Sequence, residues 1–183
     1  MNAVAPILRL HEHRFWVTQN LRDACCQLSP EQLNQPHEIG QGTLWKTLCH
    51  LYAAEYVWLA ALQGTDDAVA PGDVAGKLPG NQEGEGASTS LAALVERWQI
   101  LDGLWRAYLD AIAPEDLDKT VFRKSTSSYQ GQRIGSTAMD VLLHVATHAH
   151  YTTAQAVNML RHSGLSDMPQ SMLITLARSQ SAT

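Results

Sequence analysis

Apolar residues recur at spacings of three and four along four long segments of the chain, with polar residues between them. This spacing places the apolar side chains on one face of a helix. Ser29 and Pro30 end the first segment, Thr43 precedes the second as an N-cap, and Ser136 caps the last. The pattern therefore predicts helices over residues 6–28, 43–62, 88 or 90 to 112, and 136–162.

Two connections between these segments lack a helical pattern. Residues 64–89 are rich in glycine, proline and acidic residues, which predicts a long irregular crossover. Residues 118–133 mix β-branched and aromatic residues with serine and glycine, so we expect a short β-hairpin or an extended crossover there. A short helix is expected from about Gln170. The chain thus predicts an all-α fold, an up-down four-helix bundle with a long crossover between helices two and three and a short extended or hairpin segment before the last bundle helix.

The composition suits one globular domain over residues 1–183. Of these residues 45% are hydrophobic and 17% are charged, so the chain can bury a substantial core. The net charge of -5 and the scattered lysines and arginines leave no basic stripe for a phosphate backbone. No apolar run approaches the roughly 18 residues of a membrane span, and the N-terminal segment is charged too early for a secretory signal. We therefore expect no nucleic-acid partner, no membrane partner and a cytoplasmic location.

The cysteines do not suggest a disulfide framework. Cys25, Cys26 and Cys49 are odd in number, and two of them are adjacent, an arrangement that seldom forms a bridge. We expect them to be buried, reduced thiols.

The last helical segment carries four of the eight histidines. On a helix, His144 and His148 lie one turn apart along one edge of the apolar stripe, with Gln155 further along the same edge and Tyr151 and Thr152 nearby. Two imidazoles at this spacing can offer nitrogens to one metal ion. His150 points about 200° away from His148, so we expect it to face solvent.

A third ligand has to come from elsewhere in the chain, and His50 is the candidate. The helix 43–62 is nearly apolar all round from Leu48 onward, and His50 and Glu55 are its only strongly polar residues in that part. Small neighbours leave room beside His50 for a ligand. The alternative is a core histidine bonded to a carbonyl group or to Glu55. His11 and His13 flank charged residues in the first helix, and we expect them at the surface.

Sites in helical bundles are built from side chains on facing helices. His50, His144 and His148 are therefore predicted to line one cavity and to hold a divalent Zn, Ni or Fe ion. Such an ion would lower the pKa of a bound water or thiol and make it a nucleophile at neutral pH.

The two histidine segments also resemble those of a known family. TLWKTLCHLYAAEYVWL is similar to the second-helix signature of the DinB-like proteins, in which a histidine is followed by an acidic and an aromatic residue. DVLLHVATHAHYTTAQAVNMLR is similar to the last-helix motif of the same family, H-x-x-x-H-x-x-Y-H-R-G-Q. The resemblance spans nearly the whole chain. The matching residues are His50, Glu55 and Trp58 in the first segment and His144, His148, Tyr151 and Gln155 in the second.

One departure from the family pattern affects the metal site. The resemblance implies metal ligands at His50, at His148 and at the position that Thr152 occupies here. The Arg and Gly of the motif are likewise replaced, by Thr153 and Ala154. A neutral hydroxyl is a poor metal ligand beside imidazole. Either His144 substitutes from one turn earlier, a carboxylate or water fills the position, or the site is empty. We take His144 as the predicted third ligand.

The resemblance implies a metal-dependent enzyme with thiol-dependent S-transferase or isomerase chemistry, whose partners are a small-molecule substrate or a low-molecular-weight thiol. Two alternatives stay open. One is a non-catalytic ligand-binding or stress-related bundle with a degenerate, metal-free histidine site. The other is metal-assisted hydrolysis of a small amide or ester. Five tryptophans and broad apolar faces, together with the frequent dimers of similar proteins, also predict a homodimer.

Overall fold

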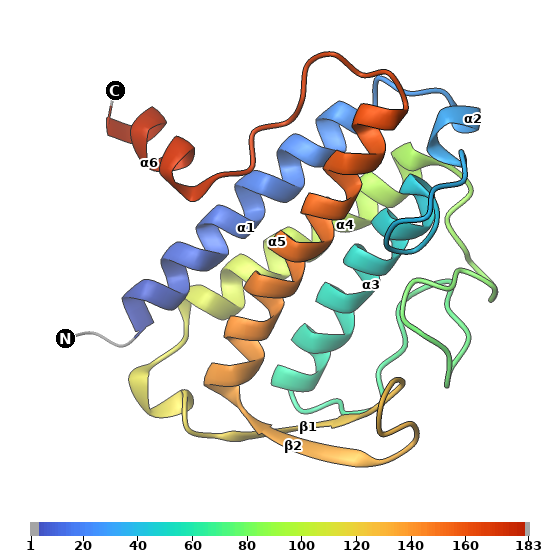
Figure 1. Ribbon diagram of the computed structural model, residues 1–183. Coiled ribbons are helices and arrows are strands. Elements are labelled where there is room, and N and C mark those ends of the chain that lie inside the picture. Colours follow the sequence, from blue (N-terminus) through green and yellow to red (C-terminus); the bar gives the residue numbers. More distant parts are fainter. Residues whose placement is uncertain (1–3, 182–183) are drawn as a thin grey trace.

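The computed structural model describes residues 4–181, which are mostly helical with one small two-stranded sheet. Four long helices lie side by side, and the sheet lies across one end of them (Figure 1). The elements in chain order are α1 (Val4–Cys25), α2 (Pro30–Leu33), α3 (Leu44–Leu62), α4 (Leu91–Asp110), the 3-10 turn η1 (Pro114–Asp116), β1 (Thr120–Lys124), β2 (Arg133–Thr137), α5 (Ala138–His162) and α6 (Leu173–Ser181).

Each long helix packs mainly against two others, in the order α1, α5, α3, α4 and back to α1. Helix α3 runs antiparallel to α5, since Thr47 near its start contacts Met159 and His50 faces His148. Helices α3 and α4 run parallel, because residues 63–90 carry the chain back to the end at which α3 began (Figure 1). The up-down expectation is thus met only in part. The long connection allows two consecutive helices to point the same way.

The helix starts are defined by side-chain caps. The Thr43 and Ser90 hydroxyls accept hydrogen bonds from the backbone of Lys46 and Ala93, as expected for N-caps. The prediction that Ser136 caps the last helix is wrong. Ser136 pairs with Val121 in the sheet, so the strand continues to Thr137, which caps α5 instead.

The segment before α5 forms the antiparallel hairpin that the sequence allowed, with its strands at residues 120–124 and 133–137. Val121 points inward and packs with Ala61, Ala138 and Val141, where α3 ends and α5 begins. This contact fixes the hairpin against the helices and directs its tip toward the loop that follows α3.

The core is built from the apolar faces that the periodicity predicted. The stripe of α5 is buried throughout, and two tryptophans of α4, Trp98 and Trp105, are fully enclosed. The buried stripe residues are Ala138, Leu142, Val145, Ala149, Ala156 and Leu160.

Two expectations about polar residues in α1 and the thiols are wrong. His11 and His13 are buried rather than at the surface. The His11 Nε2 atom lies 3.1 Å from the Leu142 carbonyl oxygen, and its ring stacks on Trp105. Among the free cysteines, Cys25 and Cys49 are buried as expected, but Cys26 is exposed. His11 and His13 are buried because α1 contacts α4, α5 and α6, and these helices cover a face of α1 that has charged neighbours in the sequence.

None of the helices within residues 4–181 combines the length and apolar character needed to cross a lipid bilayer.

Candidate functional site

His50 is positioned by the loop that follows its own helix. Its Nδ1 atom lies 2.8 Å from the carbonyl oxygen of Pro79. A carbonyl oxygen can only accept, so Nδ1 carries the proton of this hydrogen bond. In the neutral ring, Nε2 is then unprotonated and free to bind a ligand. The predicted alternative of a bond to a carbonyl group is therefore seen, and the bond also orients the ring.

His148 on α5 faces His50 directly. The two Nε2 atoms are 3.3 Å apart, and the rings meet edge to face with their centroids 5.2 Å apart. The Thr152 hydroxyl, one turn further along α5, lies 3.4 Å from the same His148 nitrogen. Burial, with smaller effects of His50 and His144, lowers the pKa of His148 to about 4. His148 is therefore a neutral imidazole at neutral pH.

His144 lies beside this pair. Its ring centroid is 5.6 Å from that of His148 and 5.3 Å from that of Trp58, which it meets edge to face. Desolvation on the side of the ring that faces the protein lowers the pKa of His144 as well, although the residue as a whole is exposed to solvent. Its ring nitrogens form no hydrogen bond within the described residues 4–181.

The other polar residues that the sequence singled out do not join the histidines. His150 is exposed on another side of α5, as expected, near His13. Tyr151 is 67% exposed. Glu55 is buried in a pair with Arg14 and accepts a hydrogen bond from Trp98, so it stabilises the core between α1, α3 and α4 rather than orienting His50.

The three histidines line one cavity of about 280 Å³. Helix α3, the loop around Pro79, the hairpin and α5 each contribute part of its wall. No aspartate or glutamate is among the lining residues. These are His50, Ala54, Val57, Trp58, Leu78, Pro79, Arg123, Lys124, Ser125, Thr126, Ser127, Tyr129, Ile134, Ser136, His144 and His148.

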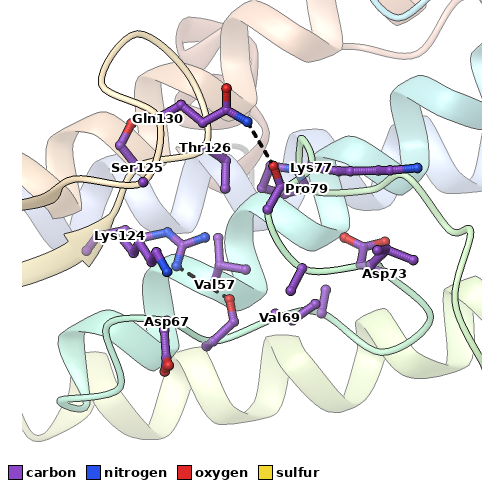
Figure 2. A pocket seen from close by; sticks show the side chains of 17 residues that line it. Val57, Asp67, Val69, Asp73, Lys77, Pro79, Lys124, Ser125, Thr126 and Gln130 are labelled. Carbon is purple, nitrogen blue, oxygen red and sulfur yellow. Dashed lines mark hydrogen bonds between the residues drawn. The ribbon is translucent and has the colours of Figure 1, made fainter.

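A second cavity of about 370 Å³ adjoins the first and shares with it the wall formed by Val57, Pro79 and residues 123–126. Figure 2 shows the Gln130 side chain of the hairpin tip pointing toward the loop that carries Lys77 and Pro79. The Gln130 side chain donates to the Gly76 carbonyl oxygen at 3.2 Å, which ties the tip to the loop. Sequence reasoning missed this wall. The run of two basic and four hydroxyl residues at 123–128 was the available signal.

The donor atoms fit a divalent metal ion in part. Two nitrogens bound to one tetrahedral zinc ion at about 2.0–2.1 Å are about 3.3–3.4 Å apart. The His50 and His148 Nε2 atoms have this separation, and the Thr152 oxygen lies at a similar distance from His148. Within residues 4–181, however, no three His, Cys, Asp or Glu side chains are grouped so that they could hold a metal ion together. The third ligand therefore stays a prediction.

Comparison with known proteins gives a family and a fold. The model of the family described as the DinB superfamily matches residues 16–156. A solved structure from Enterococcus faecalis, titled as a conserved protein, is similar with a TM-score of 0.59 and 15% sequence identity. The similarity covers 88% of this chain and 96% of that one, and at this identity it supports the fold alone. The comparison with curated proteins gives no match.

Proposed function

This chain belongs to the DinB superfamily, and from this premise we propose that it is a metal-dependent enzyme acting on a small molecule. The observation that supports the proposal best is the pair of Nε2 atoms of His50 and His148, which face each other at 3.3 Å in the wall of a cavity. We assign these two residues as ligands of a divalent Zn, Ni or Fe ion. We also propose that the chain has the family's bundle architecture, forms a homodimer and is located in the cytoplasm. The free cysteines would stay reduced there.

The two histidines are prepared for this role in different ways. The Pro79 carbonyl holds the His50 proton on Nδ1 and leaves Nε2 free. Burial keeps His148 neutral, so its nitrogen is available without competition from a proton at neutral pH. When bound, a divalent ion lowers the pKa of a water or thiol that shares it.

For the third ligand we propose His144, which lines the same cavity one turn before His148. The Thr152 hydroxyl occupies the position of the family's third histidine, and it can instead orient a bound water or thiol by a hydrogen bond. Thiol-dependent transfer or isomerisation is the proposed reaction, because a divalent ion held by these imidazoles would lower the pKa of a low-molecular-weight thiol bound to it.

A metal-free histidine pair is the second candidate, and one observation favours it. A separation of 3.3 Å also allows the His148 Nε2–H group to donate to His50 Nε2, so the two rings satisfy each other without an ion. In that case the cavity is a binding site and the protein is not a metalloenzyme.

Calorimetric titration of Zn or Ni into the tag-free protein separates these candidates. We expect binding by the wild type, its loss in His50→Ala and His148→Ala, and an at least tenfold weaker affinity in His144→Ala. His150→Ala is the matched control, because this histidine lies on the same helix and outside the cavity. Its affinity should equal that of the wild type.

Thr152→His tests the third position directly. If His144 already completes the ligand set, Thr152→His changes the affinity little. If the set is incomplete, the added imidazole raises the affinity by well over tenfold. No binding by the wild type or by Thr152→His would contradict the metal proposal. Release of thioether product from a thiol and an electrophile, compared with ester hydrolysis by the same loaded protein, then identifies the reaction class.

A further inference from the structure

The cavity that contains the histidines is positively charged on one wall. Arg123 and Lys124 of β1 line it together with the hydroxyl groups of the hairpin tip. No carboxylate faces them from the other walls, since the lining holds no acidic residue. A cavity with this lining favours a negatively charged ligand over a neutral or positive one.

Arg123 is the central cation of this wall. Its side chain is nine-tenths buried, and it lines both adjoining cavities. Its Nη1 atom donates only long hydrogen bonds, of 3.3 and 3.4 Å, to the backbone carbonyl oxygens of Asp66 and Ala68. Its guanidinium carbon lies 5.9 Å from the centre of the Trp58 ring.

The charges of Asp66 and Asp67 act on Arg123 from nearby, but neither carboxylate forms an ion pair with it. The Asp66 carboxylate pairs with Arg133 on the outer side of the hairpin. Asp73 accepts hydrogen bonds from the backbone of Gly80 and Gln82 within its own loop. Asp67 is exposed at the second cavity. Among residues 4–181, no carboxylate oxygen lies within 4.0 Å of the Arg123 guanidinium, so this buried cation has no ion-pair partner within the described chain. A buried charge is costly unless it is paired, and an anionic ligand would supply the missing partner.

We propose that the histidine cavity binds a small carboxylic acid whose carboxylate is held by Arg123, with Lys124 close by. The guanidinium presents a planar fork of donors that matches a carboxylate. Apolar side chains line the same cavity and suit the hydrocarbon part of such a ligand, namely Ala54, Val57, Trp58, Leu78 and Ile134. This inference deepens the proposed function by naming its substrate class, with the reacting end of the acid at His50 and His148. Carboxylate binding itself requires no metal.

The test compares two probes of equal size and different charge, hexanoate and hexanamide. Binding is followed by two-dimensional NMR of protein freed of metal, with the chelator removed by gel filtration because chelators are carboxylates themselves. We expect the wild type to bind hexanoate about tenfold more tightly than hexanamide, with shifts at Trp58 and His148. Arg123→Met, which keeps the length and removes the charge, should abolish this preference, and Arg123→Lys should retain part of it.

Arg133→Met is the matched control. Arg133 is a cation on the same hairpin, but it lines neither the histidine cavity nor the second cavity. The preference of Arg133→Met for hexanoate over hexanamide should equal that of the wild type. Equal binding of the two probes by the wild type, no binding of hexanoate, or an unchanged preference in folded Arg123→Met would each overturn the proposal. Circular dichroism checks folding, and the wild-type comparison decides the question if Arg123→Met does not fold. Because no metal is present, failure here is distinct from failure of the metal titration.

Discussion

At the scale of single residues, burial changes the chemistry of several ionisable groups in α1. His11 is the clearest case. Its Nδ1 atom accepts a hydrogen bond from Arg14 Nε at 3.1 Å, and its Nε2 atom faces the Leu142 carbonyl oxygen. Burial and the neighbouring Arg14 charge lower the pKa of His11 from 6.5 to about 3. The ring is therefore neutral in the folded protein and becomes charged on unfolding in mild acid.

This shift predicts how stability depends on pH. The folded state binds fewer protons than the unfolded state between pH 6.5 and about 3. His11 therefore leaves the free energy of unfolding unchanged above pH 6.5 and lowers it as the pH falls below that value. The free energy of unfolding should lose up to about 1.4 kcal/mol per pH unit from this group. In His11→Gln, the free energy of unfolding measured by urea denaturation should fall less steeply as the pH decreases from 6 to 4, because about one proton fewer is taken up on unfolding.

The control for this measurement is His162→Gln, which replaces an exposed histidine at the end of α5. Its pH slope should match that of the wild type. An unchanged slope in His11→Gln would show that His11 is not responsible for the loss of stability in acid.

At the scale of elements, the connection between α3 and α4 determines the orientation of His50. Residues 63–90 have no regular secondary structure, yet Asp73 ties their backbone together and Pro79 bonds to the His50 ring. Gly80 follows directly and has a φ of +87°. A Cβ atom at this position would lie 2.3 Å from the His50 Cα atom, so only glycine lets the loop approach α3 closely enough.

Gly80→Ala should therefore damage the site and the fold together. Gly76 is the matched control, because it lies in the same loop with a φ of +79° and has open space around its added Cβ. Gly76→Ala should cost about 1–2 kcal/mol from backbone strain alone. Gly80→Ala should cost roughly 1–3 kcal/mol more, because the overlap with α3 is added.

Urea denaturation measures these costs, and ¹⁵N NMR of the imidazole reports whether His50 keeps its proton on Nδ1. We expect that signal to change in Gly80→Ala and to persist in Gly76→Ala. Equal costs in the two variants, with an unchanged imidazole signal, would contradict the role of the close approach.

At the scale of the whole molecule, the homodimer expected from the sequence stays a prediction. Ile100 and Leu104 lie one turn apart on α4, opposite its buried tryptophans, and are 63% and 51% exposed. Burial of this pair against its own copy about a two-fold axis would remove apolar surface from water. We expect sedimentation velocity to give a dimer at micromolar concentration, with Leu104→Glu shifted toward the monomer. Met139→Glu, on exposed α5 surface, is the control, and a monomeric wild type would contradict the prediction.

Local patterns in the sequence determined the long helices, the buried stripe of α5 and the hairpin. Each depends on the spacing of neighbouring residues, which the period of a helix or strand converts directly into a face. The shared face of His144 and His148 follows from the same geometry. The resemblance placed Thr152 at a ligand position, and the structure puts its hydroxyl 3.4 Å from His148.

Contacts between distant segments decided the rest. The sequence neighbours of His11 are charged, but the packing of α1 against α4 and α5 buries it beside Trp105. Only the long loop brings the Pro79 carbonyl to His50, and only the hairpin brings Arg123 to the histidines. The spacing of residues along the sequence does not predict these contacts, because each depends on where separate elements pack in space. The sequence alone therefore determined which helix faces are apolar, and the tertiary structure decided which polar groups those faces enclose.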